Sequence, residues 1–198
     1  MLKLKYMFEN FELAKLALEN WEHDEEGLAE SLKYFRISSN AVYPFSAGGK
    51  RCFLRLAPVE EKMEQNLRGE LVFLDYLQKA GYSSMKPVPA KAGSVLLTLD
   101  TEWGTYYASV FEGVSGNAIE DTDYSAEIMV AYGKTLGRLH CLSMEYEPDC
   151  RKWSYIEVLA WIKSVLLEYH APKDMWEEAE QMESAMSLIL RMECTIFS

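Results

Sequence analysis

The sequence is poor in histidine and cysteine and in residues of positive charge. Its 198 residues include three histidines and four cysteines, and 20 lysines and arginines stand against 31 aspartates and glutamates, a formal net charge of −11. No C-x-x-C pair occurs, and His23, His140 and His170 lack the spacing of a ligand cluster. A metalloenzyme is therefore poorly supported, no metal ligands are assigned, and the cysteines are expected to be reduced structural thiols.

The deficit of positive charge argues against nucleic acid as a partner. An acidic surface repels a phosphodiester backbone, and the longest basic run is Lys50-Arg51. Free nucleotides remain open as ligands because they need only a few well-placed donors.

Long apolar runs are also missing. No uninterrupted stretch approaches the about 20 residues that a membrane-spanning helix requires. Glu9 and Glu12 interrupt what would be the apolar part of an export signal. We therefore expect a cytoplasmic protein with no membrane partner, and a hydrophobic content of 49% is enough for a sizeable core.

The first half of the chain changes from helical to alternating period. Residues 2–20 carry apolar positions at helical spacing, and the charged run after them is typical of a solvated helix end. Short β-branched and aromatic runs then predict three antiparallel strands, at 32–37, 41–46 and 51–57. The pair Gly48-Gly49 can supply the positive φ of a tight hairpin turn between the last two.

The rest of the chain is predicted as one helix, two strands and three helices. Pro58 closes the third strand and residues 60–78 are helical in pattern. A loop punctuated by prolines leads to a strand at 94–99, and a fifth strand ends in Gly113 and Gly116. The later helices are expected at about 124–143, 153–169 and 173–194.

Two charges stand in apolar surroundings. Arg55 interrupts the run Cys52–Leu56 of the third strand, and Glu70 falls in the middle of the apolar stripe of the helix at 60–78. A buried cation and a buried anion are costly unless they pair, so we expect Arg55 and Glu70 to meet. An ordinary structural ion pair is one interpretation of this arrangement, an Arg55 side chain that extends to the edge of the strand is another, and a ligand site is the third.

Three further features favour the ligand site. One is the order of the elements: a hairpin, a third strand with an inward cation, a helix with an inward acid, two more strands, an exit that contains glycine, and then helices. The turn Ser38-Ser39-Asn40 between the first two strands offers backbone N–H groups and hydroxyls to a phosphate. The segment "VFEGVSG" leaves the last strand through residues with little side-chain crowding, so its backbone groups are accessible to a nucleobase.

Residues 33–140 resemble the N-terminal lobe and hinge of the aminoglycoside phosphotransferase and choline kinase-like family, which is related to protein kinases. The stretches that carry the resemblance, in order, are "RISSNAVYPF", "KRCFLRLAP", "RGELVFLDYLQKAG", "YYASVFEGVSG" and "YGKTLGRLHCLS". The implied fold is α+β and protein-kinase-like, with a five-stranded antiparallel lobe holding one packed helix, followed by an incomplete all-helical lobe. The implied boundaries are a helical segment at 1–27, an ATP-binding lobe at 28–112, a hinge at 113–117 and a helical lobe at 118–198.

The resemblance implies an ATP site with named residues. Arg55 takes the position of the lysine that holds the α- and β-phosphates, and Glu70 is its helix partner. Arginine replaces lysine here, which gives a forked phosphate contact in place of a point charge. The resemblance assigns Ser38, Ser39 and Asn40 to the loop that covers the phosphates, and Phe111, Glu112, Gly113 and Val114 to the hinge that meets the adenine.

The catalytic part of the family pattern is missing. The family uses an H-x-D-x-x-x-x-N loop and a later aspartate for Mg²⁺ and the acceptor hydroxyl, and no histidine of this chain begins such a loop. We therefore assign no catalytic residue, and expect ATP with Mg²⁺ as the cofactor although the magnesium ligands are not in the chain. The pattern is that of the front part of a larger small-molecule phosphotransferase, with an acceptor that the sequence does not identify. The alternative is a non-catalytic nucleotide-binding or protein-interaction module.

Apolar side chains in the helical tail predict a homodimer formed through residues 145–198.

Overall fold

The structure is a computed structural model that describes residues 11–148 and 155–196. The first part of the helix expected at 2–20 and the first two residues of the helix expected at 153–169 lie outside the described residues. The chain divides into two compact units, residues 1–151 and residues 152–198. The first unit contains every residue of the expected nucleotide site.

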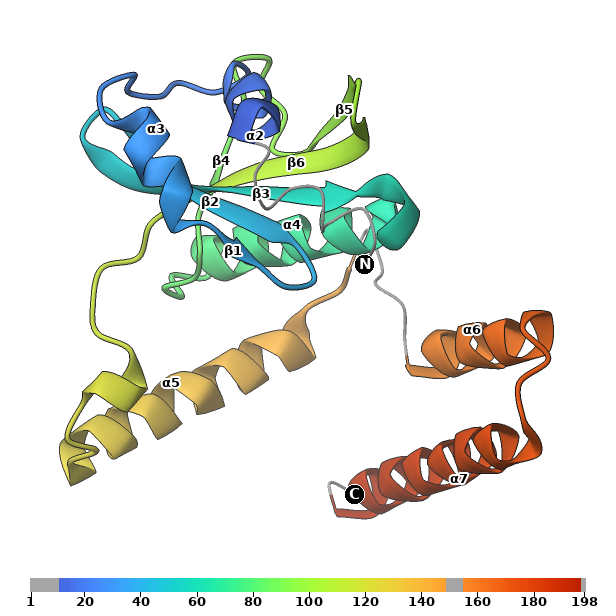
Figure 1. Cartoon of the computed structure of the whole chain (residues 1–198). Coiled ribbons are helices and arrows are strands. Elements are labelled where there is room, and N and C mark those ends of the chain that lie inside the picture. Colours follow the sequence, from blue (N-terminus) through green and yellow to red (C-terminus); the bar gives the residue numbers. More distant parts are fainter. Residues whose placement is uncertain (1–10, 149–154, 197–198) are drawn as a thin grey trace. The chain divides into compact units, whose positions relative to one another are not determined.

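The first unit is built on an antiparallel sheet (Figure 1). Its strands follow the order β1-β2-β3-β6-β4, and β5 also pairs with β6. Their bounds are β1 Arg36–Ile37, β2 Ala41–Ala47, β3 Lys50–Pro58, β4 Pro87–Val88, β5 Leu97–Thr101 and β6 Gly104–Glu112. The turn between β2 and β3 has the expected positive φ, 57° at Gly48 and 74° at Gly49.

Helices cover both faces of this sheet (Figure 1). One face packs on α2 (Phe11–Leu18), α3 (Leu28–Ser31) and Trp21, and the other packs on α4 (Glu64–Lys79). The alternation of β3 explains this division, because Cys52, Leu54 and Leu56 point into the core beneath α2 while the residues between them face α4. The position of Arg55 on the α4 face follows directly.

The N-terminal segment is also tied to the sheet by polar contacts. The Asp24 carboxylate accepts the backbone N–H of Gly48 at 2.9 Å and that of Gly49 at 3.0 Å. These two hydrogen bonds hold the pKa of Asp24 below its usual range. The charged run is therefore not simply a helix end, because Asp24 lies beyond α2 and fixes the tip of the β2–β3 hairpin.

The first expected strand is shorter than its residue types suggested. Leu32–Tyr34 form a 3₁₀ turn, and only Arg36–Ile37 are paired in β1. The reason is the helical spacing of Leu28 and Leu32, which are both buried in the core under the sheet. The apolar side chains that suggest a strand in the sequence belong to a short helical segment in the structure.

The sheet has six strands where five were expected. The additional strand, β4, pairs Pro87 with Phe111 and Val88 with Val110 at the edge of β6. A two-residue strand that contains proline has no local signature, and it exists because an edge of β6 is available beside it. The strand expected at 94–99 begins later, at Leu97, because a turn closes from the Ala90 N–H to the Ser94 carbonyl at 2.8 Å.

The helix expected at 60–78 also begins later. Val59–Glu61 form a 3₁₀ turn, and α4 starts at Glu64. Beyond the hinge, a third 3₁₀ turn at Ile119–Asp121 leads to α5 (Ala126–Glu145). Arg138 of α5 donates to the carbonyls of Ala80 and Gly81 at 3.0 and 3.1 Å, where α4 ends. A cation at a helix C-terminus satisfies carbonyls that have no helical partner.

The second unit contains two helices, α6 (Tyr155–Glu168) and α7 (Lys173–Ile196), which pack against each other. The Lys163 ammonium lies 2.6 Å from a Glu183 carboxylate oxygen across this pair, and Leu159, Leu166 and Ala179 are buried. Trp161 and Leu167 are more than half exposed. The homodimer expected through this tail stays a prediction. Within residues 11–148 and 155–196, no helix combines the length and the apolar character needed to cross a membrane.

Candidate nucleotide site

Arg55 and Glu70 form the pair that the sequence predicts. The Arg55 Nη1 group donates to both carboxylate oxygens of Glu70, each at 2.9 Å. The strand places Arg55 on the α4 face, and the helical stripe turns Glu70 toward the sheet. The side chains are 13% and 26% exposed, so the pair is largely withdrawn from water but open on one side.

Two residues of β6 complete the surroundings of Arg55, and sequence reasoning missed both roles. The Arg55 Nε group donates to the Ser109 hydroxyl at 3.2 Å. The guanidinium carbon lies 4.8 Å from the centre of the Phe111 ring, in a cation–π contact. Ser109 is 2% exposed and lies directly across from Arg55 in the β3–β6 register. That register is set by tertiary pairing, so no local signal identifies Ser109.

These contacts leave one edge of the guanidinium without a partner. Arg55 Nη2 is buried and has no hydrogen-bond acceptor among the described residues. A buried donor without an acceptor costs about 1–3 kcal/mol. Such a cost is compatible with a group that completes its hydrogen bonds with a ligand. A phosphate oxygen is a suitable acceptor because guanidinium groups bind phosphate through charge-assisted hydrogen bonds.

The turn of Ser38, Ser39 and Asn40 lies beside the Arg55 end of the site. The Ser38 N–H donates to the Asn40 carbonyl at 3.0 Å, and both serines are exposed. Ala41, the next residue, pairs with Leu56, which adjoins Arg55 in β3. The Asn40 Oδ1 atom is buried and, like Arg55 Nη2, has no hydrogen-bond partner among the described residues. Two buried polar atoms without a hydrogen-bond partner among the described residues, Asn40 Oδ1 and Arg55 Nη2, thus belong to residues that the sequence assigns to one site.

The hinge segment lies toward the other end of β3. Cys52 pairs with Glu112, and the Gly113 N–H donates to the Arg51 carbonyl at 2.7 Å. Arg55 lies three residues after Cys52 along the extended strand, a distance of about 10 Å. This spacing suits a nucleotide with its base at the hinge and its phosphates at the arginine.

Glu112 and Gly113 have already used their backbone donors within the fold. The Glu112 N–H donates to the Lys86 carbonyl at 2.9 Å, and the Glu112 carboxylate lies 2.7 Å from the Lys86 ammonium. The hydrogen bond from Lys86 holds the pKa of Glu112 below its usual range. An adenine base at this segment would therefore hydrogen-bond to the backbone carbonyls and to the N–H of Val114. Val114 is 74% exposed.

A close approach explains the glycine at position 113. A Cβ atom added there would lie 2.8 Å from the Arg51 carbonyl oxygen, a distance that real side chains do not show. The hydrogen bond that joins the hinge to β3 therefore requires glycine. Gly113 therefore allows the hinge to pack closely against β3, in addition to leaving the segment free of side-chain crowding.

Comparison with known proteins assigns the family. The model of the phosphotransferase enzyme family matches residues 32–191, which is most of the chain. The chain belongs to this family, as the resemblance implied. Amicoumacin kinase of Bacillus subtilis (strain 168) is 22% identical over 184 residues, which are 86% of this chain and 54% of the relative. An uncharacterized protein of Deinococcus radiodurans is 28% identical over 129 residues, or 65% of this chain and 37% of the relative.

Solved structures show the same fold. Amicoumacin kinase hAmiN, in complex with AMP-PNP, Ca²⁺ and Ami, matches with a TM-score of 0.72 at 20% identity over 92% of this chain and 55% of its own. A microcompartment-associated aminopropanol kinase matches with a TM-score of 0.59 at 21% identity, over 74% of this chain and 45% of its own. The α+β, kinase-like fold is confirmed. The chain spans about half the length of these kinases.

Proposed function

We propose that this chain binds ATP on the α4 face of the sheet. Arg55 holds the α- and β-phosphates, Glu70 orients Arg55, the turn at Ser38, Ser39 and Asn40 covers the phosphates, and residues 111–114 receive the adenine. The observation that carries the proposal is the Arg55 guanidinium, which is held on three sides and has a buried Nη2 group without an acceptor among the described residues. The family and the AMP-PNP complex of the kinase hAmiN support a nucleotide as the missing partner.

We propose further that the whole protein transfers the ATP γ-phosphate to a hydroxyl group of a small molecule. The amicoumacin kinases and the aminopropanol kinase support this, since each of them is named for a small molecule. The chain contains no H-x-D-x-x-x-x-N sequence, so no residue of it is assigned to the acceptor hydroxyl. Its contribution to the reaction is to bind the nucleotide and to orient its phosphates.

A divalent metal enters this proposal only together with the nucleotide. Within the described residues, no group of three or more His, Cys, Asp or Glu side chains is arranged to hold a metal ion. Mg²⁺ bound to ATP phosphates would supply charge neutralisation, as in kinases generally. The described side chains do not form a site for it, so we derive no step of the reaction through the metal.

A second candidate function is a non-catalytic module in which the Arg55–Glu70 pair is purely structural. The Arg55–Glu70 contact is also what this alternative requires, because a purely structural pair needs the same two hydrogen bonds of 2.9 Å. The two functions differ in what a neutral replacement of the pair does. A structural pair can be exchanged for neutral side chains at small cost in stability and with no other loss.

Calorimetric titration with Mg·ATP tests the proposal. The unmodified chain is expected to bind with a dissociation constant between about 1 μM and 1 mM. The double variant Arg55→Met with Glu70→Gln retains the shape of the pair without its charges, so it is expected to fold and to lose binding. The matched control is Lys33→Met with Glu30→Gln, an exposed ion pair of 2.6 Å outside the site. Equal ATP binding by all three proteins, or none by the unmodified chain, would favour the structural alternative.

A further inference from the structure

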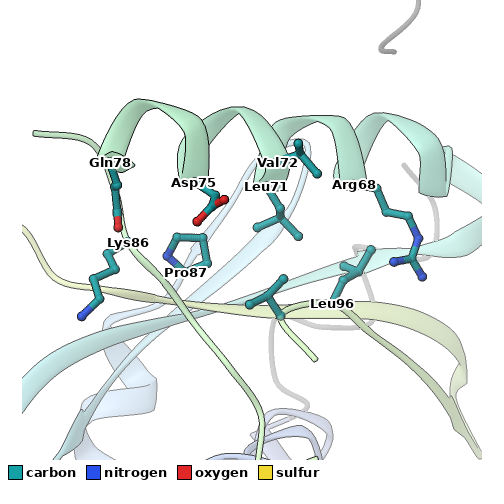
Figure 2. Close-up of a pocket in the computed structure, with 9 residues that line it drawn as sticks. Arg68, Leu71, Val72, Asp75, Gln78, Lys86, Pro87 and Leu96 are labelled. Atoms are coloured by element: carbon teal, nitrogen blue, oxygen red, sulfur yellow. The ribbon is translucent and has the colours of Figure 1, made fainter. Parts of the chain in front are cut away.

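A cavity of about 490 Å³ lies between α4 and the segments at β4 and before β5. Figure 2 shows Leu71, Pro87 and Leu96 facing one another across it, with Arg68 at one end of the helix and Gln78 and Lys86 at the other. The volume is within the range of about 300–1,000 Å³ that small-molecule pockets occupy. The remaining lining residues are Val72, Asp75 and Val95.

The cavity is distinct from the candidate nucleotide site. None of the residues assigned to the nucleotide lines it. The two sites nevertheless share structural elements, because α4 carries both Glu70 and Leu71. Lys86 lines the cavity and also pairs with Glu112 of the hinge at 2.7 Å.

The polar lining of the cavity favours an anion. Arg68 and Lys86 stand against one acid, Asp75, in a chain whose net charge is −11. Each cation has one carboxylate partner, Glu64 for Arg68 and Glu112 for Lys86. A guanidinium has five N–H donors and an ammonium has three, so both can accept a further anion. The Asp75 carboxylate is paired with Lys79 at 2.6 Å, which reduces its repulsion of an anion.

The apolar part of the lining defines the body of the ligand. Leu71 and Leu96 are 4% and 6% exposed and form the wall, while Val72 is 37% exposed at the opening. A branched aliphatic or aromatic group of modest size fits walls of this kind, and burying it supplies the hydrophobic part of the affinity.

We infer that this cavity is a second binding site, for a small amphiphilic anion. Such a ligand has one aromatic or branched aliphatic body, packed between α4 and Pro87, and one carboxylate or sulfonate directed to Lys86. The inference does not depend on nucleotide binding, because no residue of the nucleotide site takes part. A ligand bound there contacts the helix that carries Glu70 and the lysine that holds Glu112.

A series of three probes with the same body and different charge tests the inference. Binding of 4-phenylbutyrate, 4-phenylbutanol and 4-phenylbutylamine to the full chain is measured by ligand-detected NMR without nucleotide. The anion is expected to bind most tightly and the amine most weakly. Lys86→Gln is expected to weaken 4-phenylbutyrate about two- to fivefold, as an exposed charge pair does, and to leave the alcohol unchanged.

A cavity-filling variant tests whether the probes bind in this cavity. Val72→Phe is expected to weaken all three probes by about tenfold or more, because the ring occupies the opening. Val130→Phe is the matched control, a valine of α5 that is 55% exposed and outside the cavity, and it is expected to bind as the unmodified chain does. Absence of saturation by 4-phenylbutyrate at millimolar concentration would overturn the inference. Equal affinity of Val72→Phe and the unmodified chain, or loss of the charge order with Lys86 intact, would do the same.

Discussion

Three contacts of different chemistry hold the Arg55 guanidinium, and each restricts a different part of it. Glu70 binds Nη1, Ser109 binds Nε, and the Phe111 ring lies against the plane of the group. A side chain of this length normally loses considerable rotamer freedom when it binds a ligand. Here much of that freedom is already lost in the folded chain, so Arg55 is pre-organised for the phosphate contact that we propose.

Removing the Ser109 hydroxyl tests this pre-organisation. Ser109→Ala is expected to weaken ATP binding about two- to tenfold, because Arg55 then pays part of its ordering cost on binding. Stability is expected to fall by about 1 kcal/mol, the value of one hydrogen bond. Calorimetric titration and urea unfolding measure the two effects. Adenosine affinity is the readout that a merely structural role would move, and we expect it to stay constant. Ser46→Ala in β2 is the control.

Asp24 gives a prediction in pH. Its folded-state pKa lies below its ordinary value of 3.8, so its charged form contributes stability above that value. This contribution is lost as the pH falls through the folded-state pKa. Asp24→Asn is expected to melt at a lower temperature than the unmodified chain at neutral pH.

The difference between the two melting temperatures is expected to shrink as the pH falls below about 4. Thermal unfolding followed by circular dichroism between about pH 3 and pH 7 measures it. A difference that stays constant over this range would mean that the carboxylate charge at Asp24 does not stabilise the hairpin.

The elements that the sequence predicts well are those whose local period and tertiary burial agree. β2, β3, β6 and α4 show alternating or helical patterns, and each buries the side that its pattern indicates. The sequence pattern predicts too long a strand at β1 and no strand at β4, for opposite reasons. The residues before β1 have strand-like side chains but pack as a helical turn, whereas β4 has no strand signal and exists through its neighbour β6.

The candidate site divides in the same way. Arg55 and Glu70 are visible in the sequence because each is a charge in an apolar pattern. Ser109 is not visible, because its contact with Arg55 depends on the β3–β6 register across 54 residues of chain. The cation–π contact of Phe111 depends on the same register. Pairing between distant strands therefore accounts for what sequence reasoning missed.

The close contact between the hinge and β3 predicts how a substitution at Gly113 changes the stability of the fold. Gly113→Ala places a Cβ atom 2.8 Å from the Arg51 carbonyl oxygen, so we expect a loss of about 1–3 kcal/mol as the segment shifts. Gly133→Ala is the control, because a Cβ at this helical position of α5 meets nothing within 4 Å. It is expected to stabilise by about 0.5–1 kcal/mol. Urea unfolding of both variants measures the opposite signs, and a neutral Gly113→Ala would contradict the close approach.

In the first unit, the N-terminal segment belongs to the core of the sheet. Trp21 is 1% exposed, and its indole N–H donates to the Val88 carbonyl at 3.0 Å. Trp21→Ala is expected to cost about 3–5 kcal/mol, as truncation of a buried aromatic side chain does. Trp103→Ala removes a side chain that is 37% exposed and is expected to cost less than about 1 kcal/mol. Urea unfolding followed by circular dichroism compares them, and similar costs would mean that the segment is peripheral.

For the molecule as a whole, the proposed function depends on one contact, between a phosphate of the nucleotide and Arg55. The most direct measurement is a cycle of four affinities, those of ATP and adenosine for the unmodified chain and for the variant Arg55→Met with Glu70→Gln. We predict that the variant loses about 10- to 150-fold in ATP affinity, the value of one or more charge-assisted hydrogen bonds, and nothing in adenosine affinity. Equal losses for ATP and adenosine, or no loss for either, would contradict a phosphate contact at Arg55.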